Sequence, residues 1–140
     1  MGSAVAEILH RDRRRLADRV GAPLKIVRAA VRDTNRPRTA ATRKIDLVTD
    51  VSAVTGASDI DLVVELAGGV DLPKRWILDA LAGAKPVVTA NKAVVAAHGP
   101  KLHGASDRAG AGLFYEGAVA GGIPIIRTLR DSLASDQILG

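Results

Sequence analysis

Short apolar runs alternate with amphipathic stretches along most of the chain, and this alternation predicts strands and helices in turn. In residues 1–20 the apolar side chains fall on one helical stripe, and Gly21 and Pro23 mark the end of that helix. The continuous apolar runs typical of buried strands are 24–31, 60–66, 86–89 and 113–116. The further helical patterns are 72–81, 92–109 with an interruption near Gly99 and Pro100, and 123–133. Residues 44–58 favour a short helix or a strand, and residues 136–139 favour the opening of a further strand.

The short spacing of these elements predicts a parallel sheet built from βαβ units, within one folding unit that has no repeat or linker. Such sheets bind ligands at the carboxyl ends of their strands. The strand ends that would share this edge are 31–33, 66–69, 89–92 and 115–117. We therefore expect the ligand site there.

The first residues, MGSAVAEIL, are typical of the helix that follows a dinucleotide fingerprint, which is a strand and then G-x-G-x-x-G. Gly2 takes the place of the third glycine and is a candidate cofactor contact. The strand and the first two glycines do not stand before it. The predicted fold is an α/β, Rossmann-like doubly wound parallel sheet with its first strand missing.

Composition excludes some classes of protein without choosing among the rest. Hydrophobic residues make up 47% of the chain and charged residues 25%, which is typical of a globular domain rather than a disordered one. The absence of cysteine excludes disulfides and thiolate catalysis. No signal peptide is evident, and no apolar run reaches the ~18 residues of a membrane span. We expect a cytoplasmic protein with no membrane partner.

Positive charge is concentrated in the first third of the chain. Residues 1–44 hold 12 Lys and Arg against 4 Asp and Glu, a net charge of +8, whereas residues 45–140 carry −3. This asymmetry indicates either a phosphate-bearing small ligand or nucleic acid, and a solvated helix face explains the arginines of 11–19 equally well. The aromatic content of 2% disfavours a nucleic-acid-binding module, because bases need aromatic side chains on which to stack.

Arg32 and Asp33 stand together at the end of a predicted strand. In a doubly wound sheet the end of the second strand meets the adenosine ribose, where an acidic residue suits NAD and an arginine suits the 2′-phosphate of NADP. Arg32 therefore favours NADP over NAD, although a solvent-facing Arg–Asp pair explains the same residues.

Two longer segments carry a resemblance to a known family: DLVVELAGGVDLPKRWILDALAGAKPVVTANKAVVAAHG and LFYEGAVAGGIPIIRTLRDSL. Together they resemble the cofactor domain of homoserine dehydrogenase over about residues 60–133, and the resemblance extends back to Gly2. The resemblance implies NAD(P)-dependent interconversion of aspartate 4-semialdehyde and homoserine, in the biosynthesis of threonine, methionine and isoleucine. It also implies a small-molecule substrate, no nucleic-acid partner, and homo-oligomeric full-length members.

The family's catalytic lysine falls on Lys92, where an ammonium group would stabilise the forming oxyanion and take part in proton transfer. A helix N-terminus disfavours a cation, so this role would explain why a lysine stands there. The resemblance further implies that Thr89 and Asn91 place the nicotinamide and its ribose, and that Ala67 and Gly68 let the cofactor approach the backbone.

The resemblance also implies a monovalent cation, such as sodium, bound by backbone carbonyl oxygens. The positions are Glu116, Val119, Gly121 and Ile123. Cations of this kind prefer oxygen ligands from irregular backbone, but glycines needed for tight turns explain the same segment without an ion.

The chain is much shorter than a complete member of that family. We expect residues 1–140 to be a partial NAD(P)-binding domain, with the catalytic and substrate domain beginning at about 117–140 and its remainder absent. Such a piece would bind cofactor weakly and turn over little substrate. A non-catalytic regulatory fragment and a basic nucleic-acid-binding module are the alternatives.

Overall fold

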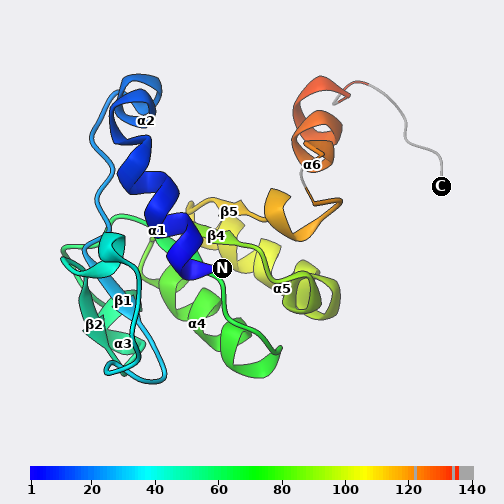
Figure 1. The fold of residues 1–140 in the computed structure, drawn as a ribbon. Helices are drawn as coiled ribbons and strands as arrows, with labels where there is room; N and C mark the ends of the chain where they lie inside the picture. The colour runs from blue at the N-terminus through cyan, green and yellow to red at the C-terminus, as the bar shows by residue number, and fades with distance from the viewer. Residues whose placement is uncertain (122, 134, 136–140) are drawn as a thin grey trace. The chain divides into compact units, whose positions relative to one another are not determined.

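The computed structural model describes residues 1–121, 123–133 and 135 (Figure 1). Its strands are all parallel and lie in two sheets, as an α/β protein of the doubly wound class requires. The chain divides into two units, Met1–Ile60 and Asp61–Gly140. The predicted fold class is confirmed, whereas the single sheet in one folding unit is not what the structure has.

The strand order gives the reason for the two sheets. In the doubly wound order 3-2-1-4-5-6, the pair β1-β2 matches places 2 and 3, and the trio β3-β4-β5 matches places 4 to 6. The described residues supply no strand for place 1 of this order, and their strands pair only within each group. The predicted single sheet is therefore two sheets.

The first unit begins with two helices, α1 (Gly2–Arg11) and α2 (Arg13–Val20), where the sequence predicts one. The interruption is at Asp12, whose carboxylate binds the guanidinium groups of Arg11 and Arg15 at 3.0 and 3.2 Å. Gly21 ends α2 with a left-handed φ of 80°, a conformation that glycine adopts without strain. The predicted end of the helix is thus confirmed.

Two short parallel strands follow, β1 (Arg28–Ala30) and β2 (Asp46–Val48), with the 3₁₀ turn η1 (Ala40–Thr42) between them. The helix α3 (Ser52–Thr55) comes next, so the ambiguous stretch 44–58 holds both a strand and a helix. β1 is shorter than the apolar run 24–31, because only residues 28–30 find a partner strand.

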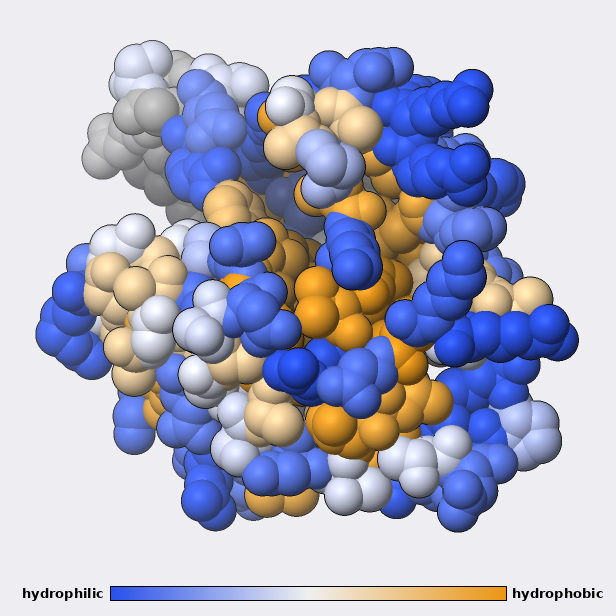
Figure 2. Space-filling view, turned by 90° about the vertical axis from the view of Figure 1, so that its left-hand side faces the viewer, coloured by the Kyte–Doolittle hydropathy of each residue, from blue (hydrophilic) through white to orange (hydrophobic). Residues whose placement is uncertain are grey.

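The first unit buries little apolar surface. Ala6 and Thr55 are its buried residues in the part of the chain described. Large apolar side chains instead remain exposed, among them Ile8 and Val20. Figure 2 shows apolar surface among strongly hydrophilic side chains on one face of the molecule.

The second unit is a three-stranded sheet, β3 (Val63–Glu65), β4 (Val87–Thr89) and β5 (Leu113–Phe114), with helices as crossovers. These helices, α4 (Asp71–Ala82) and α5 (Lys92–Ala109), pack against each other and against the strands (Figure 1). The register places Val63, Val87 and Leu113 in one row.

The core of the molecule lies between this sheet and its two helices. That row of strand residues is buried, and the helices contribute the completely buried Ile77, Leu81, Val94 and Leu102. The alternate positions, Val64 and Phe114, lie on the opposite face and are 43% and 44% exposed. Successive strand residues point to opposite faces, so one face of the sheet is packed and the other is open.

Helix α5 continues through Pro100, and the predicted interruption near Gly99 and Pro100 is wrong. A proline removes one helical hydrogen bond and crowds the preceding turn. Here the preceding residue is a glycine with no Cβ, and the helix packs along α4, so the ladder resumes after one gap. None of the described helices has the length and apolar character needed to cross a membrane.

The chain then turns through η2 (Glu116–Ala118), α6 (Ile125–Arg127) and the π-helical turn η3 (Thr128–Ser132). The helix predicted over 123–133 is confirmed in position, although it begins two residues later and is not regular. The strand predicted over 136–139 lies outside the described residues.

Candidate cofactor-binding site

The carboxyl ends of β3 and β4 lie side by side, because these parallel strands pair in register up to Glu65 and Thr89. Each strand leads through a short loop into a helix, β3 into α4 and β4 into α5. The two loops therefore meet at one edge of the sheet, where ligands of parallel sheets bind.

A buried carboxylate joins the two strand ends. Glu65 is 6% exposed; its Oε1 accepts the backbone N–H of Ala67 at 2.7 Å, and its Oε2 accepts the hydroxyl of Thr89 at 2.6 Å. Thr89, which is 1% exposed, also accepts the backbone N–H of Asn91 at 3.0 Å. The hydroxyl of Thr89 therefore both donates and accepts a hydrogen bond within the protein.

The side chain of Asn91 completes this connection. Its Nδ2 donates to the carbonyl oxygens of Ala67 at 3.1 Å and Gly69 at 2.9 Å, while Oδ1 accepts the N–H of Val94 at 3.2 Å. In this orientation both N–H groups of the amide donate to carbonyl oxygens, whereas in the flipped orientation the amide oxygen would face those oxygens. Hydrogen bonds thus run from Glu65 through Ala67, Asn91 and Thr89 back to Glu65, and we call this closed set the strand-end ring.

Lys92 is the first residue of α5 and directly follows the helix cap that Asn91 provides. Its side chain is exposed, and it forms no ion pair with any residue that the structure describes. The first turn of α5 contains no acidic residue. Because the helix dipole disfavours a cation at this end, the ammonium group is available to an anion or to charge that develops on a bound molecule.

The loop after β3 leaves room above its backbone. Ala67, Gly68 and Gly69 are exposed, and a Cβ built on Gly68 or Gly69 meets no atom within 4 Å. Gly69 has a φ of +90°, which side chains other than that of glycine rarely adopt. An extended ligand could lie against this backbone.

The turn η2 approaches the same edge from β5, since it contacts β4. A Cβ at Gly117 would lie 3.5 Å from the Cβ of Ala90, an ordinary van der Waals distance. Position 117 would therefore accept a small side chain.

The carboxylate of Glu116 holds the start of α6, because it accepts the backbone N–H groups of Ile126 and Arg127 at 3.0 and 3.1 Å. The group that Glu116 can still offer a cation is its backbone carbonyl oxygen. That oxygen already accepts the N–H of Val119 at 3.2 Å. The described residues contain no group of three His, Cys, Asp or Glu side chains that could hold a metal ion. In the described part of this loop, backbone oxygens are thus the groups left for an ion.

Two of the four predicted carbonyl ligands have no hydrogen-bond donor among the residues that the structure describes. The oxygens of Val119 and Gly121 accept no hydrogen bond from the described chain, whereas that of Ile123 accepts the N–H of Ile125 at 2.8 Å. Ala120 and Gly121 have left-handed φ angles of 53° and 64°. The backbone is irregular here, as a carbonyl site requires, but no structural feature identifies an ion.

The remaining predicted site residues belong to the first unit. Gly2 is the first residue of α1 and a Cβ there would meet no atom, while Arg32 is exposed just beyond β1. Asp33 uses its carboxylate locally, accepting the N–H of Asn35 at 2.8 Å. The structure brings together the predicted residues of the second unit: Ala67, Gly68, Thr89, Asn91 and Lys92.

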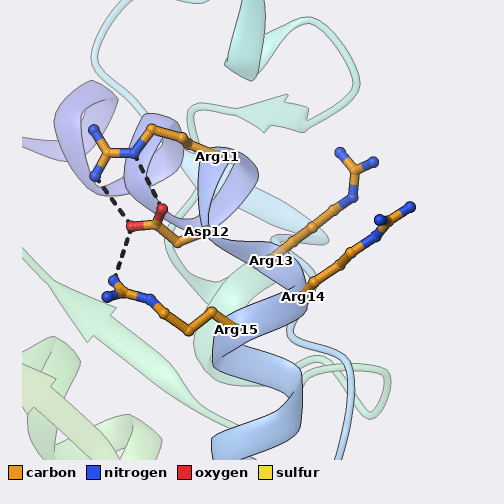
Figure 3. Close-up of a pocket in the computed structure, with 5 residues that line it drawn as sticks. All are labelled: Arg11, Asp12, Arg13, Arg14 and Arg15. Atoms are coloured by element: carbon orange, nitrogen blue, oxygen red, sulfur yellow. Dashed lines mark hydrogen bonds and ion pairs between the residues drawn. The ribbon is translucent and has the colours of Figure 1, made fainter.

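A hollow on the first unit is lined by Arg11, Asp12, Arg13, Arg14 and Arg15. Figure 3 shows two of these arginines directed at Asp12, while Arg13 and Arg14 extend away from it. The hydrogen bonds from Arg11 lower the pKa of Asp12 below its usual value of 3.8, and the charges of Arg11 and Arg15 act in the same direction. This ion pair joins α1 to α2 and leaves Arg13 and Arg14 as a solvated face.

Sequence reasoning missed Glu65. A signal was available, because Glu65 is a charged residue two positions after the buried Val63 and thus shares its inward face. A carboxylate on that face needs buried hydrogen-bond donors. The sequence did not show that Thr89 is one of them, because Thr89 lies 24 residues further along the chain.

Comparison with known proteins gives a consistent family. Residues 1–116 match the family model described as homoserine dehydrogenase, NAD binding domain. A homoserine dehydrogenase of Corynebacterium glutamicum is 42% identical over 138 residues, and that of Bacillus subtilis is 39% identical. Each alignment covers 99% of this chain, which spans 31% and 32% of the two relatives.

Solved structures agree with the sequence comparison. The crystal structure of a homoserine dehydrogenase from Thiobacillus denitrificans superposes with a TM-score of 0.88 at 37% identity, covering 96% of this chain and 31% of that one. A Staphylococcus aureus homoserine dehydrogenase at pH 7.5 gives a TM-score of 0.81 at 31% identity, covering 87% and 30%.

Proposed function

The chain belongs to the homoserine dehydrogenase family, and on that premise we propose that it is the cofactor-binding part of an NAD(P)-dependent enzyme that interconverts aspartate 4-semialdehyde and homoserine. The supporting observation is the strand-end ring, which fixes two loops at one sheet edge and starts α5 at the exposed Lys92. This reaction would serve the biosynthesis of threonine, methionine and isoleucine.

The loop at Ala67 and Gly68 would hold the nicotinamide half of the cofactor against its backbone, since a Cβ at Gly68 would project into open space. Thr89 and Asn91 would place that half indirectly, because their side chains are engaged in the ring. When bound, the cofactor supplies or accepts the hydride.

Arg32 would bind the 2′-phosphate of NADP, with Gly2 near the phosphates at the start of α1. Arg32 makes no hydrogen bond or ion pair with the described residues, and the neighbouring Asp33 is engaged with Asn35. The acidic group that would bind a free ribose hydroxyl is therefore occupied while the arginine is available, which favours NADP over NAD.

Lys92 would act on the substrate carbonyl oxygen. Its ammonium group would donate a hydrogen bond as negative charge develops there and would transfer a proton to the resulting alkoxide. The free ammonium at the helix start supports this role, because a negative charge at that position would be favourable for the helix as well as for the lysine.

The carbonyl oxygens of Glu116, Val119, Gly121 and Ile123 would hold a monovalent cation such as sodium. Two of these oxygens are free of hydrogen bonds from the described chain, and carbonyl oxygens retain a second lone pair when they accept one bond. The ion would hold the loop after β5 in place.

NADPH titration, followed by nicotinamide fluorescence, tests the cofactor assignment. We expect saturable binding to the wild-type chain and weaker binding of NADH. Arg32→Ala should weaken NADPH about tenfold while leaving NADH within about twofold, since one charge-assisted phosphate contact is lost. The matched control is Arg19→Ala, an exposed arginine of the same unit. Absence of NADPH binding, or salt-sensitive nucleic-acid binding in its place, would contradict the proposal.

The position of Lys92 can be tested without turnover by comparing the affinities for NADP⁺ and NADPH. Only the oxidised nicotinamide ring is positively charged, so an adjacent ammonium group repels it selectively. Lys92→Ala should raise the affinity for NADP⁺ relative to NADPH by about three- to tenfold, the size expected for two charges near a surface. Lys101→Ala, an exposed lysine of the same helix, should leave the ratio unchanged. Equal effects of both variants would exclude Lys92 from the nicotinamide site.

A further inference from the structure

Glu65 is a buried charged residue that the proposed mechanism does not use. It is 6% exposed and stands in a strand whose inward neighbour is Val63. Burying a carboxylate costs free energy unless hydrogen bonds compensate for lost water. No Lys, Arg or His of the described chain pairs with it, so the compensation comes from two neutral donors, Ala67 N–H and the hydroxyl of Thr89.

These two donors belong to different strand ends. One oxygen of Glu65 holds the turn after β3 and the other holds the end of β4. The amide of Asn91 then binds the carbonyl oxygens of Ala67 and Gly69 from the other side. The loop after β3 is thus fixed through both its N–H and its C=O groups. An apolar residue at position 65 would make neither of the two bonds that Glu65 accepts.

We propose that Glu65 is a positioning residue for the nicotinamide half of the cofactor. It acts through the backbone of Ala67 and through Thr89 and Asn91, setting the separation between the loop after β3 and the start of α5. The inference rests on the proposed function, because the two loops matter only if the cofactor binds between them and Lys92.

The test is Glu65→Gln, which keeps the size of the side chain but replaces one acceptor with a donor. The N–H of Ala67 needs an acceptor, so the new NH₂ group must face Thr89, whose hydroxyl already accepts the N–H of Asn91. The hydroxyl proton then has no acceptor in the ring. We expect NADPH to bind about tenfold more weakly, the effect of one lost hydrogen bond to a charged group. Adenosine 2′,5′-bisphosphate, which lacks the nicotinamide half, should bind within about twofold of wild type.

Two further variants separate positioning from general stability. Thr89→Ser retains the hydroxyl and should bind NADPH nearly as tightly as wild type. Thr89→Val removes both the bond to Glu65 and the bond from the Asn91 N–H, and should weaken NADPH at least as much as Glu65→Gln does. Combining Glu65→Gln with Thr89→Val should cost little more than Thr89→Val alone, because both changes break the bond between Thr89 and Glu65. Asp79→Asn, an exposed carboxylate on α4, is the matched control and should change neither affinity.

Hydrogen exchange of the Ala67 amide in the cofactor-free chain provides an independent measurement. It should be faster in Glu65→Gln than in wild type, because its acceptor is weakened. Unchanged NADPH affinity in Glu65→Gln, or equal weakening of NADPH and adenosine 2′,5′-bisphosphate, would overturn the inference. If the wild-type chain binds no NADPH, the proposed function itself is contradicted. That result differs from the two above, in which the wild-type chain binds NADPH and only the role of Glu65 is excluded.

Discussion

Single residues carry the chemistry of the site, and they differ in how far the sequence revealed them. Lys92 was predicted because the family resemblance places a catalytic lysine there, which would explain a cation at a helix start that the dipole disfavours. The structure shows it exposed and without an ion pair among the described residues. Glu65 was not predicted, because its value depends on Thr89 and Asn91, which only folding brings beside it.

Asp12 gives the first unit a dependence on pH. The hydrogen bonds from Arg11 hold the pKa of Asp12 below its usual 3.8 in the folded state. A lowered pKa stabilises the fold above the usual value, and this contribution is lost as the pH falls through the folded-state pKa. We therefore expect helicity of α1 and α2 to fall at a pH below 3.8, measured by far-ultraviolet circular dichroism.

The Asp12→Asn variant should lose this part of the acid transition, because it has no proton to gain. Asp18→Asn, an exposed carboxylate on α2, should keep it. Salt should reduce the difference, since exposed ion pairs are screened. Identical acid transitions for wild type and Asp12→Asn would show that the ion pair does not join the helices.

At the scale of elements, the existence and type of the helices and strands were mostly predictable and their ends were not. Apolar runs report which residues could be buried, whereas a strand extends only where a neighbour pairs with it, so 60–66 became Val63–Glu65. Local rules also overestimated the effect of Pro100, because they take no account of the packing of α5 on α4.

The loop after β3 offers a test with two adjacent glycines. Gly69 has a φ of +90°, whereas Gly68 has no positive φ, and neither would place a Cβ near another atom. Gly69→Ala should lower the free energy of unfolding by about 1 kcal/mol through backbone strain. Gly68→Ala should leave stability unchanged and weaken NADPH binding, because its methyl group would occupy the space proposed for the cofactor. Urea unfolding and NADPH titration measure the two effects.

If both alanine variants lost stability equally, strain at Gly69 would not be the cause. If Gly68→Ala bound NADPH like wild type, the cofactor would not lie against this backbone.

At the scale of the whole molecule, the two units differ in how much they bury. The second unit has a core of strand and helix side chains, including Ile77, Leu81 and Leu102, whereas Ala6 is the one buried apolar residue described in the first unit. Burial of apolar surface is the main stabilising contribution to folding. The second unit should therefore be the more stable of the two.

Native-state hydrogen exchange tests this difference. Amides of β3, β4 and α5 should exchange only through the rarest openings, whereas those of α1 and β1 should exchange faster, because few buried contacts oppose local opening. Bound NADPH should slow exchange around Ala67 in particular. Equal protection of both units in the cofactor-free chain would contradict the assignment of the core to the second unit.

The sequence by itself determined the α/β class, the order of helices and parallel strands, the family, and the strand ends at which a ligand would bind, because periodicity and motifs are local properties of the chain. The tertiary structure decided the division into two sheets, the lengths of the strands and the strand-end ring. These depend on hydrogen bonds between residues far apart in the chain, such as that from Thr89 to Glu65, and such bonds form only when folding brings both partners together.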